Sequence, residues 1–124
     1  MPGNRRPYLN LLKMKIITKI AWDRVFEKAC DVVNATRTDD LMHDVYREQM
    51  QEILDELEEA FGVQSLILDT RADYLDDPVE RRSLYLKALE LARDENDPDQ
   101  VAVVLQSLRD LDESIKLESE LPKE

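Results

Sequence analysis

Cysteine, histidine and glycine are scarce in this sequence, and each scarcity narrows the structures that it can form. The 124 residues include one cysteine, one histidine and two glycines. A single cysteine, Cys30, excludes an internal disulfide, and the lack of paired Cys and His residues excludes a structural zinc site. This cysteine usage is typical of a reducing compartment, so we expect a cytoplasmic protein.

Long apolar runs are also lacking. No segment of about 18 apolar residues occurs, so the sequence predicts no membrane span. Near the start, lysines at 13, 15 and 19 interrupt the apolar core that a signal peptide would need. We interpret residues 1–19 as a basic N-terminal tail or entry segment. Its alternating part, from Leu12 to Ile20, is either extended or the entry to a helix.

The charge is strongly negative and unevenly distributed. The chain has 17 Lys and Arg against 28 Asp and Glu, a net charge of −11. Residues 1–19 contain five basic residues and no acid, so the remaining chain has twelve basic against 28 acidic residues, a net charge of −16. Because such a surface repels phosphate backbones and anionic lipid, we expect no nucleic-acid or membrane partner and favour a basic protein partner.

Helices are the expected secondary structure, because two glycines leave few sites for hairpin turns and the β-branched residues do not form several alternating strands. The clearest starts are Asp77-Pro78 and Asp97-Pro98, each with an N-cap acceptor, a proline at the first helical position and a Glu or Gln that can reach back to the cap. Thr38 or Asp39 can begin an earlier helix that Gly62 closes in the left-handed conformation, and Ser65 can cap a short one.

The predicted fold is all-α, with about five helices stacked as antiparallel hairpins. Loops of four residues or fewer between the last four helices favour antiparallel neighbours. We expect a single helical domain over residues 20–117 and a frayed tail over 118–124. The residues expected to face the core include Trp22, Val25, Phe26, Ala29, Cys30, Val32 and Val33 in the first helix, Leu41, Met50, Leu54 and Leu57 in the second, and Tyr85, Ala88, Ala92, Val104, Leu108, Leu111 and Ile115 later.

The segment YLKALELARDENDPDQVAVVLQSL, residues 85–108, resembles the join between two tetratricopeptide helices. In that family an aromatic residue, two small alanines and an Asp-Pro turn let one helix approach the next, and Tyr85, Ala88, Ala92, Asp97 and Pro98 match this pattern. The family's period of about 34 residues is not kept. The resemblance therefore implies helical hairpins and not a peptide-binding array.

A second resemblance covers the chain from residue 39, with an acidic helix at 53–62, the segment 65–92 and a closing helix. This arrangement is similar to small acidic helical immunity proteins of bacterial toxin–immunity systems, which serve bacterial competition, including contact-dependent growth inhibition. It implies a cytoplasmic antidote that covers the active site of a toxin domain.

Catalytic and metal-binding patterns are not apparent in the sequence. Cys30 and His43 lie on different predicted helices, so neither supplies a base beside a nucleophile. The acidic stretch 94–100 lacks the glycine and the twelfth-position acid of a calcium loop, having Asp99 and Leu105 there. We therefore predict no enzyme, no metal and no cofactor.

Two groups of acids are the candidate interface. Four share one face of the second helix, and others lie around the end of the third, including Asp69. The predicted partner-binding residues are Glu52, Asp55, Glu56, Glu59, Asp73, Asp76 and Asp77. The leading hypothesis is an immunity protein that neutralises a basic toxin domain, possibly a nuclease. The alternative is a tetratricopeptide-like adaptor or secretion chaperone that binds a partner peptide.

Overall fold

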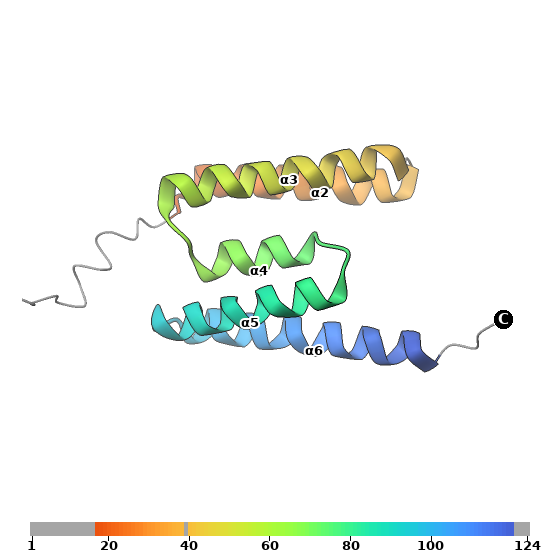
Figure 1. The fold of residues 1–124 in the computed structure, drawn as a ribbon. Helices are drawn as coiled ribbons and strands as arrows, with labels where there is room; N and C mark the ends of the chain where they lie inside the picture. The colour runs from red at the N-terminus through yellow and green to blue at the C-terminus, as the bar shows by residue number, and fades with distance from the viewer. Residues whose placement is uncertain (1–16, 39, 121–124) are drawn as a thin grey trace, which may run out of the picture. The chain divides into compact units, whose positions relative to one another are not determined.

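The computed structural model describes residues 17–38 and 40–120, and all the regular structure in this part of the chain is helical (Figure 1). The all-α prediction with five helices is confirmed there. The helices are α2 (Lys19–Thr38), α3 (Asp40–Phe61), α4 (Ser65–Asp73), α5 (Pro78–Asp94) and α6 (Pro98–Glu120). Within the same ranges, no helix combines the length and the apolar character that crossing a bilayer requires.

The chain divides between Val63 and Gln64 into two compact units. Unit 1 contains α2 and α3, and unit 2 contains α4, α5 and α6. Each unit is described below by itself. The expectation of a single domain over residues 20–117, and of antiparallel packing between the helices that flank residues 62–64, stays a prediction.

The first helix of unit 1 begins at Lys19, near the end of the stretch for which the sequence allowed either an extended conformation or the entry to a helix. Thr18 precedes it, and the Thr18 Oγ1 accepts a hydrogen bond of 3.1 Å from the backbone N–H of Ala21. The first backbone N–H groups of a helix have no carbonyl partner within it, and a threonine hydroxyl before the helix commonly accepts from one of them. Lys19 and Ile20 are therefore helical, whereas residues 1–16 of the predicted tail lie outside the described residues.

Unit 1 is a helical hairpin in which α2 and α3 pack antiparallel (Figure 1). Four predictions about its core are wrong: Phe26 is 62% exposed, Val33 is 59% exposed, Leu41 is 75% exposed, and Cys30 is an exposed residue. One helix covers only a narrow strip of its partner, and the apolar stripe of α2 is wider than that strip. The buried residues are Val25, Val32, Ala35, Met50, Leu54 and Leu57.

The end of α3 confirms the glycine prediction. Gly62 has a φ of 88°, in the left-handed region, and its N–H donates to the carbonyl of Glu58 at 2.8 Å. A β-carbon at Gly62 would have no heavy atom within 4 Å. The glycine is therefore required by its backbone conformation and not by crowding.

Unit 2 consists of α4, α5 and α6, with each helix antiparallel to the next in Figure 1. Tyr85, Ala88 and Ala92 are buried at the α5 positions that the tetratricopeptide resemblance indicated, and the alanines leave room for close packing. A closer likeness to that family stays a prediction. Ile115, predicted to be buried, is 38% exposed. The core consists of Ala72, Tyr85, Ala88, Leu89, Val104, Leu108 and Leu111.

Both Asp-Pro helix starts are confirmed. Asp77 precedes α5 and accepts from the N–H of Val79 at 3.4 Å, and Asp97 precedes α6 and accepts from the N–H of Gln100 at 3.0 Å. The turn between the two helices is a Schellman motif that the sequence did not reveal, with Asn96 at a φ of 55°. The N–H of Asp97 closes it on the carbonyl of Ala92 at 3.1 Å.

Two polar side chains differ from their predicted roles. Gln64 is the N-cap residue of α4, and Ser65 is the first helical residue. The Ser65 Oγ donates to the Ala88 carbonyl at 2.7 Å, and the Gln100 side chain, expected to reach back to Asp97, donates to Ser65 at 3.3 Å. These bonds connect three helices.

At its C-terminal end, α6 continues to Glu120, so residues 118–120 of the predicted tail are helical and residues 121–124 lie outside the described part.

Candidate functional site

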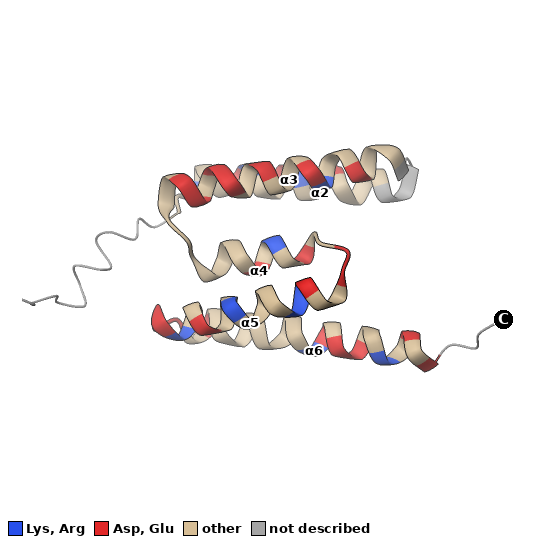
Figure 2. Ribbon diagram, viewed as in Figure 1, with Lys and Arg blue, Asp and Glu red and all other residues tan. Residues whose placement is uncertain are grey.

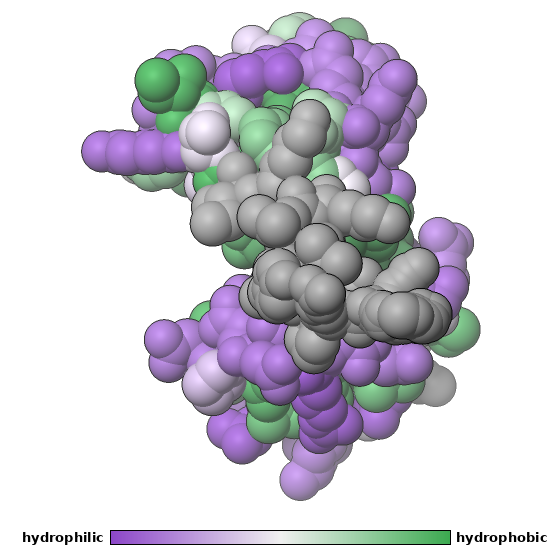
Figure 3. Space-filling model, turned by 90° about the vertical axis from the view of Figure 1, so that its left-hand side faces the viewer, coloured by the Kyte–Doolittle hydropathy of each residue, from purple (hydrophilic) through white to green (hydrophobic). Residues whose placement is uncertain are grey.

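The most charged surface of unit 1 lies along α3, which has eight acids and one arginine in 22 residues. Figure 2 shows these acids following one another along the helix. Figure 3 shows hydrophilic residues over most of the described surface that its view presents, with apolar side chains in small patches. We use the name α3 acidic face for five exposed residues at helical spacing: Glu48, Glu52, Asp55, Glu56 and Glu59.

Few basic groups neutralise this face. The Arg24 guanidinium on α2 forms an ion pair with Glu56. Lys28 on α2 instead donates to Gln49 at 2.7 Å and pairs with Asp31 at 3.2 Å. Within residues 17–38 and 40–120, no ion pair involves the carboxylates of Glu48, Glu52 or Glu59.

The α3 acidic face is unfavourable for the helix that carries it. Like charges four residues apart repel by about 0.2–0.5 kcal/mol per pair, and Glu48, Glu52 and Glu56 are spaced in this way. The last turn has no basic residue, and Glu59 lies there, beside the partial negative charge of the helix C-terminus. The fold therefore gains nothing evident from the charges of Glu48, Glu52 and Glu59, whereas Glu56 contributes the ion pair with Arg24.

The second predicted acidic group has a different character, because three of its members have internal roles in unit 2. Asp77 caps α5. Asp69 is 5% exposed and accepts from the Ser107 hydroxyl at 3.0 Å, and Asp73 accepts from the Tyr85 hydroxyl at 2.5 Å. Asp76 is exposed in the α4–α5 connection. Four of the seven predicted interface residues thus lie on α3 and three lie in unit 2, and their joint interface stays a prediction.

Burial perturbs the carboxyl groups of α4. Burial, reinforced by the charge of Asp73, raises the pKa of Asp69 to about 6, while the Ser107 hydrogen bond acts in the opposite direction. Burial also raises the pKa of Asp73, against the Tyr85 hydrogen bond and the Arg81 charge. The pKa of Tyr85 is raised by burial and by its bond to Asp73, so the phenol remains neutral.

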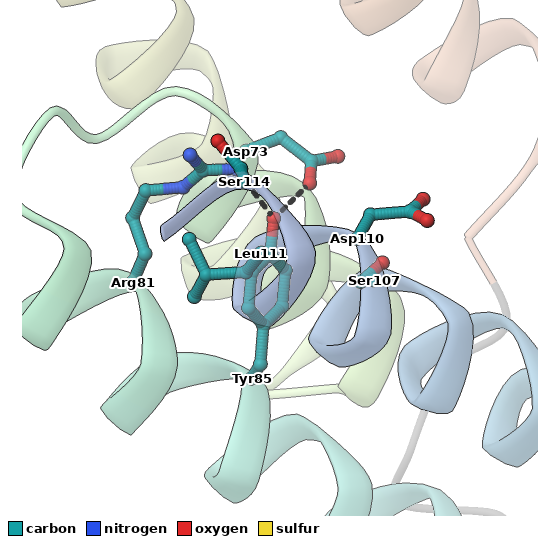
Figure 4. Close-up of a pocket in the computed structure, with 7 residues that line it drawn as sticks. All are labelled: Asp73, Arg81, Tyr85, Ser107, Asp110, Leu111 and Ser114. Carbon is teal, nitrogen blue, oxygen red and sulfur yellow. Dashed lines mark hydrogen bonds between the residues drawn. The ribbon is translucent and has the colours of Figure 1, made fainter. Parts of the chain in front are cut away.

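A pocket of about 230 Å³ opens beside these groups, where α5 and α6 meet the end of α4. Arg81 is fixed in its wall, since its Nε donates to the Ala72 carbonyl and its Nη2 to the Tyr85 hydroxyl, both at 3.1 Å. In Figure 4, Asp73 and Arg81 reach the Tyr85 hydroxyl from different sides. The lining residues are Asp73, Arg81, Tyr85, Ser107, Asp110, Leu111 and Ser114.

Most of the residues that line this pocket were not predicted from the sequence as site residues. Only Asp73 among its lining was predicted as a site residue. A weak signal was available on α6, where Ser107, Asp110 and Ser114 recur at helical spacing beside an apolar stripe. Their relation to Arg81 depends on contacts across the α5–α6 turn, which no local pattern reveals.

Within residues 17–38 and 40–120, the structure brings no catalytic group together around the lone cysteine or histidine. Cys30 lies on α2, and His43 lies on α3 with its Nδ1 at 3.8 Å from Asp44. Among the residues that the structure describes, no three His, Cys, Asp or Glu side chains are placed to hold a metal ion. Residues 94–100, considered above as a calcium loop, form the α5–α6 turn.

Comparison with protein-family models, with curated proteins and with solved structures finds no match for this chain.

Proposed function

We propose that this protein binds a basic partner protein through the α3 acidic face. The observation that supports this proposal is the line of exposed carboxylates on α3, three of which have no ion pair within the described residues. Such a surface accelerates encounter with a cationic protein, because long-range attraction steers the two molecules together. The net charge of −11 acts in the same direction.

The most concrete form of this function is immunity against a bacterial toxin. It rests on the resemblance to small acidic helical immunity proteins and on the charge of the α3 acidic face. A toxin that acts on nucleic acid has a cationic groove, and a row of carboxylates can occupy this groove in place of the phosphates. Binding there would cover the toxin's active site, and the toxin would lose its activity.

The second candidate function is a tetratricopeptide-like adaptor or secretion chaperone. The observation in its favour is an exposed apolar strip on α2, formed by Phe26, Cys30 and Val33 at positions i, i+4 and i+7. Binding through such a strip would change little with salt, whereas binding through the α3 acidic face would weaken steeply between about 50 and 500 mM salt.

Capture of partners from a lysate of the source organism tests the proposal with matched variants. The test variant reverses Glu48, Glu52 and Glu59 to Lys, which breaks no ion pair among the described residues. The control makes the same change of net charge on α6 by reversing three exposed acids: Glu113, Glu118 and Glu120. Far-UV circular dichroism checks that both variants remain helical.

We expect the wild type and the α6 control to retain the same basic protein, and the α3 variant to lose it. The retained protein should be released by about 500 mM salt. Equal retention by all three proteins would exclude the α3 acidic face as the binding surface. Equal loss of the captured protein by both variants would show that net charge alone determines its retention, and would contradict a binding surface on α3. For the immunity form, the captured protein should be toxic when expressed alone and harmless when expressed with the wild type.

A further inference from the structure

The pocket of unit 2 has the features of a receptor for one amphipathic cation. Its open volume of about 230 Å³ is below the ~300–1,000 Å³ typical of clefts that hold drug-sized ligands. A single side chain fits such a space better than a whole metabolite. Leu111 and the Tyr85 ring, both almost fully buried, form its apolar floor, and polar groups from α4 and α6 lie around it (Figure 4).

The electrostatics of this pocket favour a positive group. Two carboxylates, Asp73 and Asp110, line it with one guanidinium, and the buried Asp69 lies behind Ser107. Arg81 carries one positive charge and is held in place by the Ala72 carbonyl and the Tyr85 hydroxyl. It can therefore balance the charge of one of the two carboxylates. Burial raises the pKa of Asp69, and the charge of Asp73 adds to this effect.

The Asp110 carboxylate on α6 has a hydroxyl on either side of it along the helix. Ser107 lies three residues before it and Ser114 four residues after it, about 4.5 and 6 Å along the axis. The Asp110 carboxylate receives one bond, of 2.8 Å, from the Gln106 amide and has further acceptor capacity. A guanidinium has five donors in one plane and can bind several acceptors at once, whereas an ammonium acts as a point charge.

We propose that this pocket binds the guanidinium of an arginine side chain. The alkyl part of the arginine lies over Leu111 and Tyr85, and the head binds the carboxylate of Asp110 and one neighbouring hydroxyl. The inference deepens the proposed function, on which it rests for the source of the arginine: the basic partner inserts one arginine into unit 2. The site itself is independent of the α3 acidic face and is tested without any partner.

Nuclear magnetic resonance of the uniformly ¹⁵N-labelled full chain tests this site with small probes. The probes are Nα-acetyl-arginine amide, the lysine analogue and the citrulline analogue, which replaces the guanidinium by a neutral group of the same shape. We expect the arginine probe to give saturable shifts of the Ser107, Asp110 and Ser114 amides with an affinity of about millimolar. The citrulline probe should give none, and the lysine probe should bind more weakly.

Two variants assign the effect to the pocket. Asp110→Asn keeps the size and the Gln106 contact but removes the charge, and should weaken arginine binding about two- to fivefold, the range for one exposed ion pair. Glu113→Gln removes an exposed charge from α6 outside the lining and should leave the affinity unchanged.

Three results would overturn the inference: no saturable shift at these amides, equal shifts with citrulline, or equal weakening by both variants. Equal affinity for the lysine probe would overturn the assignment to guanidinium. The α3 triple reversal should bind the arginine probe as the wild type does. If the arginine probe fails to bind while that variant still loses its partner, the inference fails and the proposed function stands.

Discussion

Replacing Ser65 by alanine tests whether one buried hydroxyl holds the three helices of unit 2 together. Ser65 is fully buried at the start of α4. Its Oγ donates to the Ala88 carbonyl on α5 at 2.7 Å and accepts from the Gln100 amide on α6 at 3.3 Å. Ser65→Ala removes one oxygen and changes little else, because the two side chains differ by that atom alone.

The expected loss in free energy of unfolding is about 1–2 kcal/mol. A typical intramolecular hydrogen bond contributes about 0.5–1.5 kcal/mol net, and an unpaired buried group adds to the loss. Two features keep the effect below the upper limit of about 3 kcal/mol for a buried group left unpaired. The Ala88 carbonyl lies in mid-helix and retains its helical acceptor bond. The Gln100 side chain is only half-buried, so its amide can turn to water.

Urea denaturation followed by far-UV circular dichroism measures this difference. Ser119→Ala is the matched control, since the Ser119 Oγ also donates to a backbone carbonyl, that of Lys116, at 2.8 Å but on an exposed residue. The control should stay within about 0.5 kcal/mol of the wild type. If Ser65→Ala also stays within that range, the hydroxyl does not stabilise unit 2, and the role given to its burial is wrong.

Three further substitutions test single features of the fold by the same denaturation experiment. Because the pKa of Asp69 is raised in the folded state, the free energy of unfolding of the wild type should fall as pH rises from about 4 to about 6. Asp69→Asn should remove up to about 3 kcal/mol of that fall. Parallel pH profiles of the variant and the wild type would contradict this. Asp97→Ala should cost about 1 kcal/mol through loss of the α6 N-cap, whereas Asp99→Ala, in the first turn, should cost less. Gly62→Ala should lower the free energy of unfolding by about 1–2 kcal/mol, because φ is 88° there. No heavy atom lies within 4 Å of the added methyl group, so the loss would come from the backbone conformation alone. An unchanged stability would refute this explanation.

Local chemistry made the helix boundaries predictable. The Asp-Pro pairs at 77–78 and 97–98 and the glycine at 62 act through groups within a few residues of each other, and each acts in the structure as predicted. Ser65 shows the limit of such reasoning. Its residue type suits a cap, but its side chain turns to a carbonyl that lies 23 residues further along the chain, and only the packing of α4 on α5 brings the two together.

Burial was less predictable than helix position. Apolar periodicity gives the direction in which a helix faces its neighbour but not the width of the strip that the neighbour covers. Val25 and Val32, at the centre of the α2 stripe, are buried, whereas Phe26 and Val33, at its edge, are exposed. The candidate sites follow the same division: the α3 acidic face could be predicted from spacing within one helix, and the unit 2 pocket could not, because it is formed by three.

The acids of α3 have opposite consequences for folding and for binding, and salt separates the two. Repulsion among Glu48, Glu52 and Glu56, and the position of Glu59 at the helix C-terminus, destabilise α3 when α3 is unbound. Added salt screens this repulsion and should make the helix more stable, while it weakens attraction to a cationic protein. A bound cationic surface would relieve the same repulsion at physiological salt. Under the proposed function, the charge that weakens α3 in isolation would therefore add to the affinity for a partner.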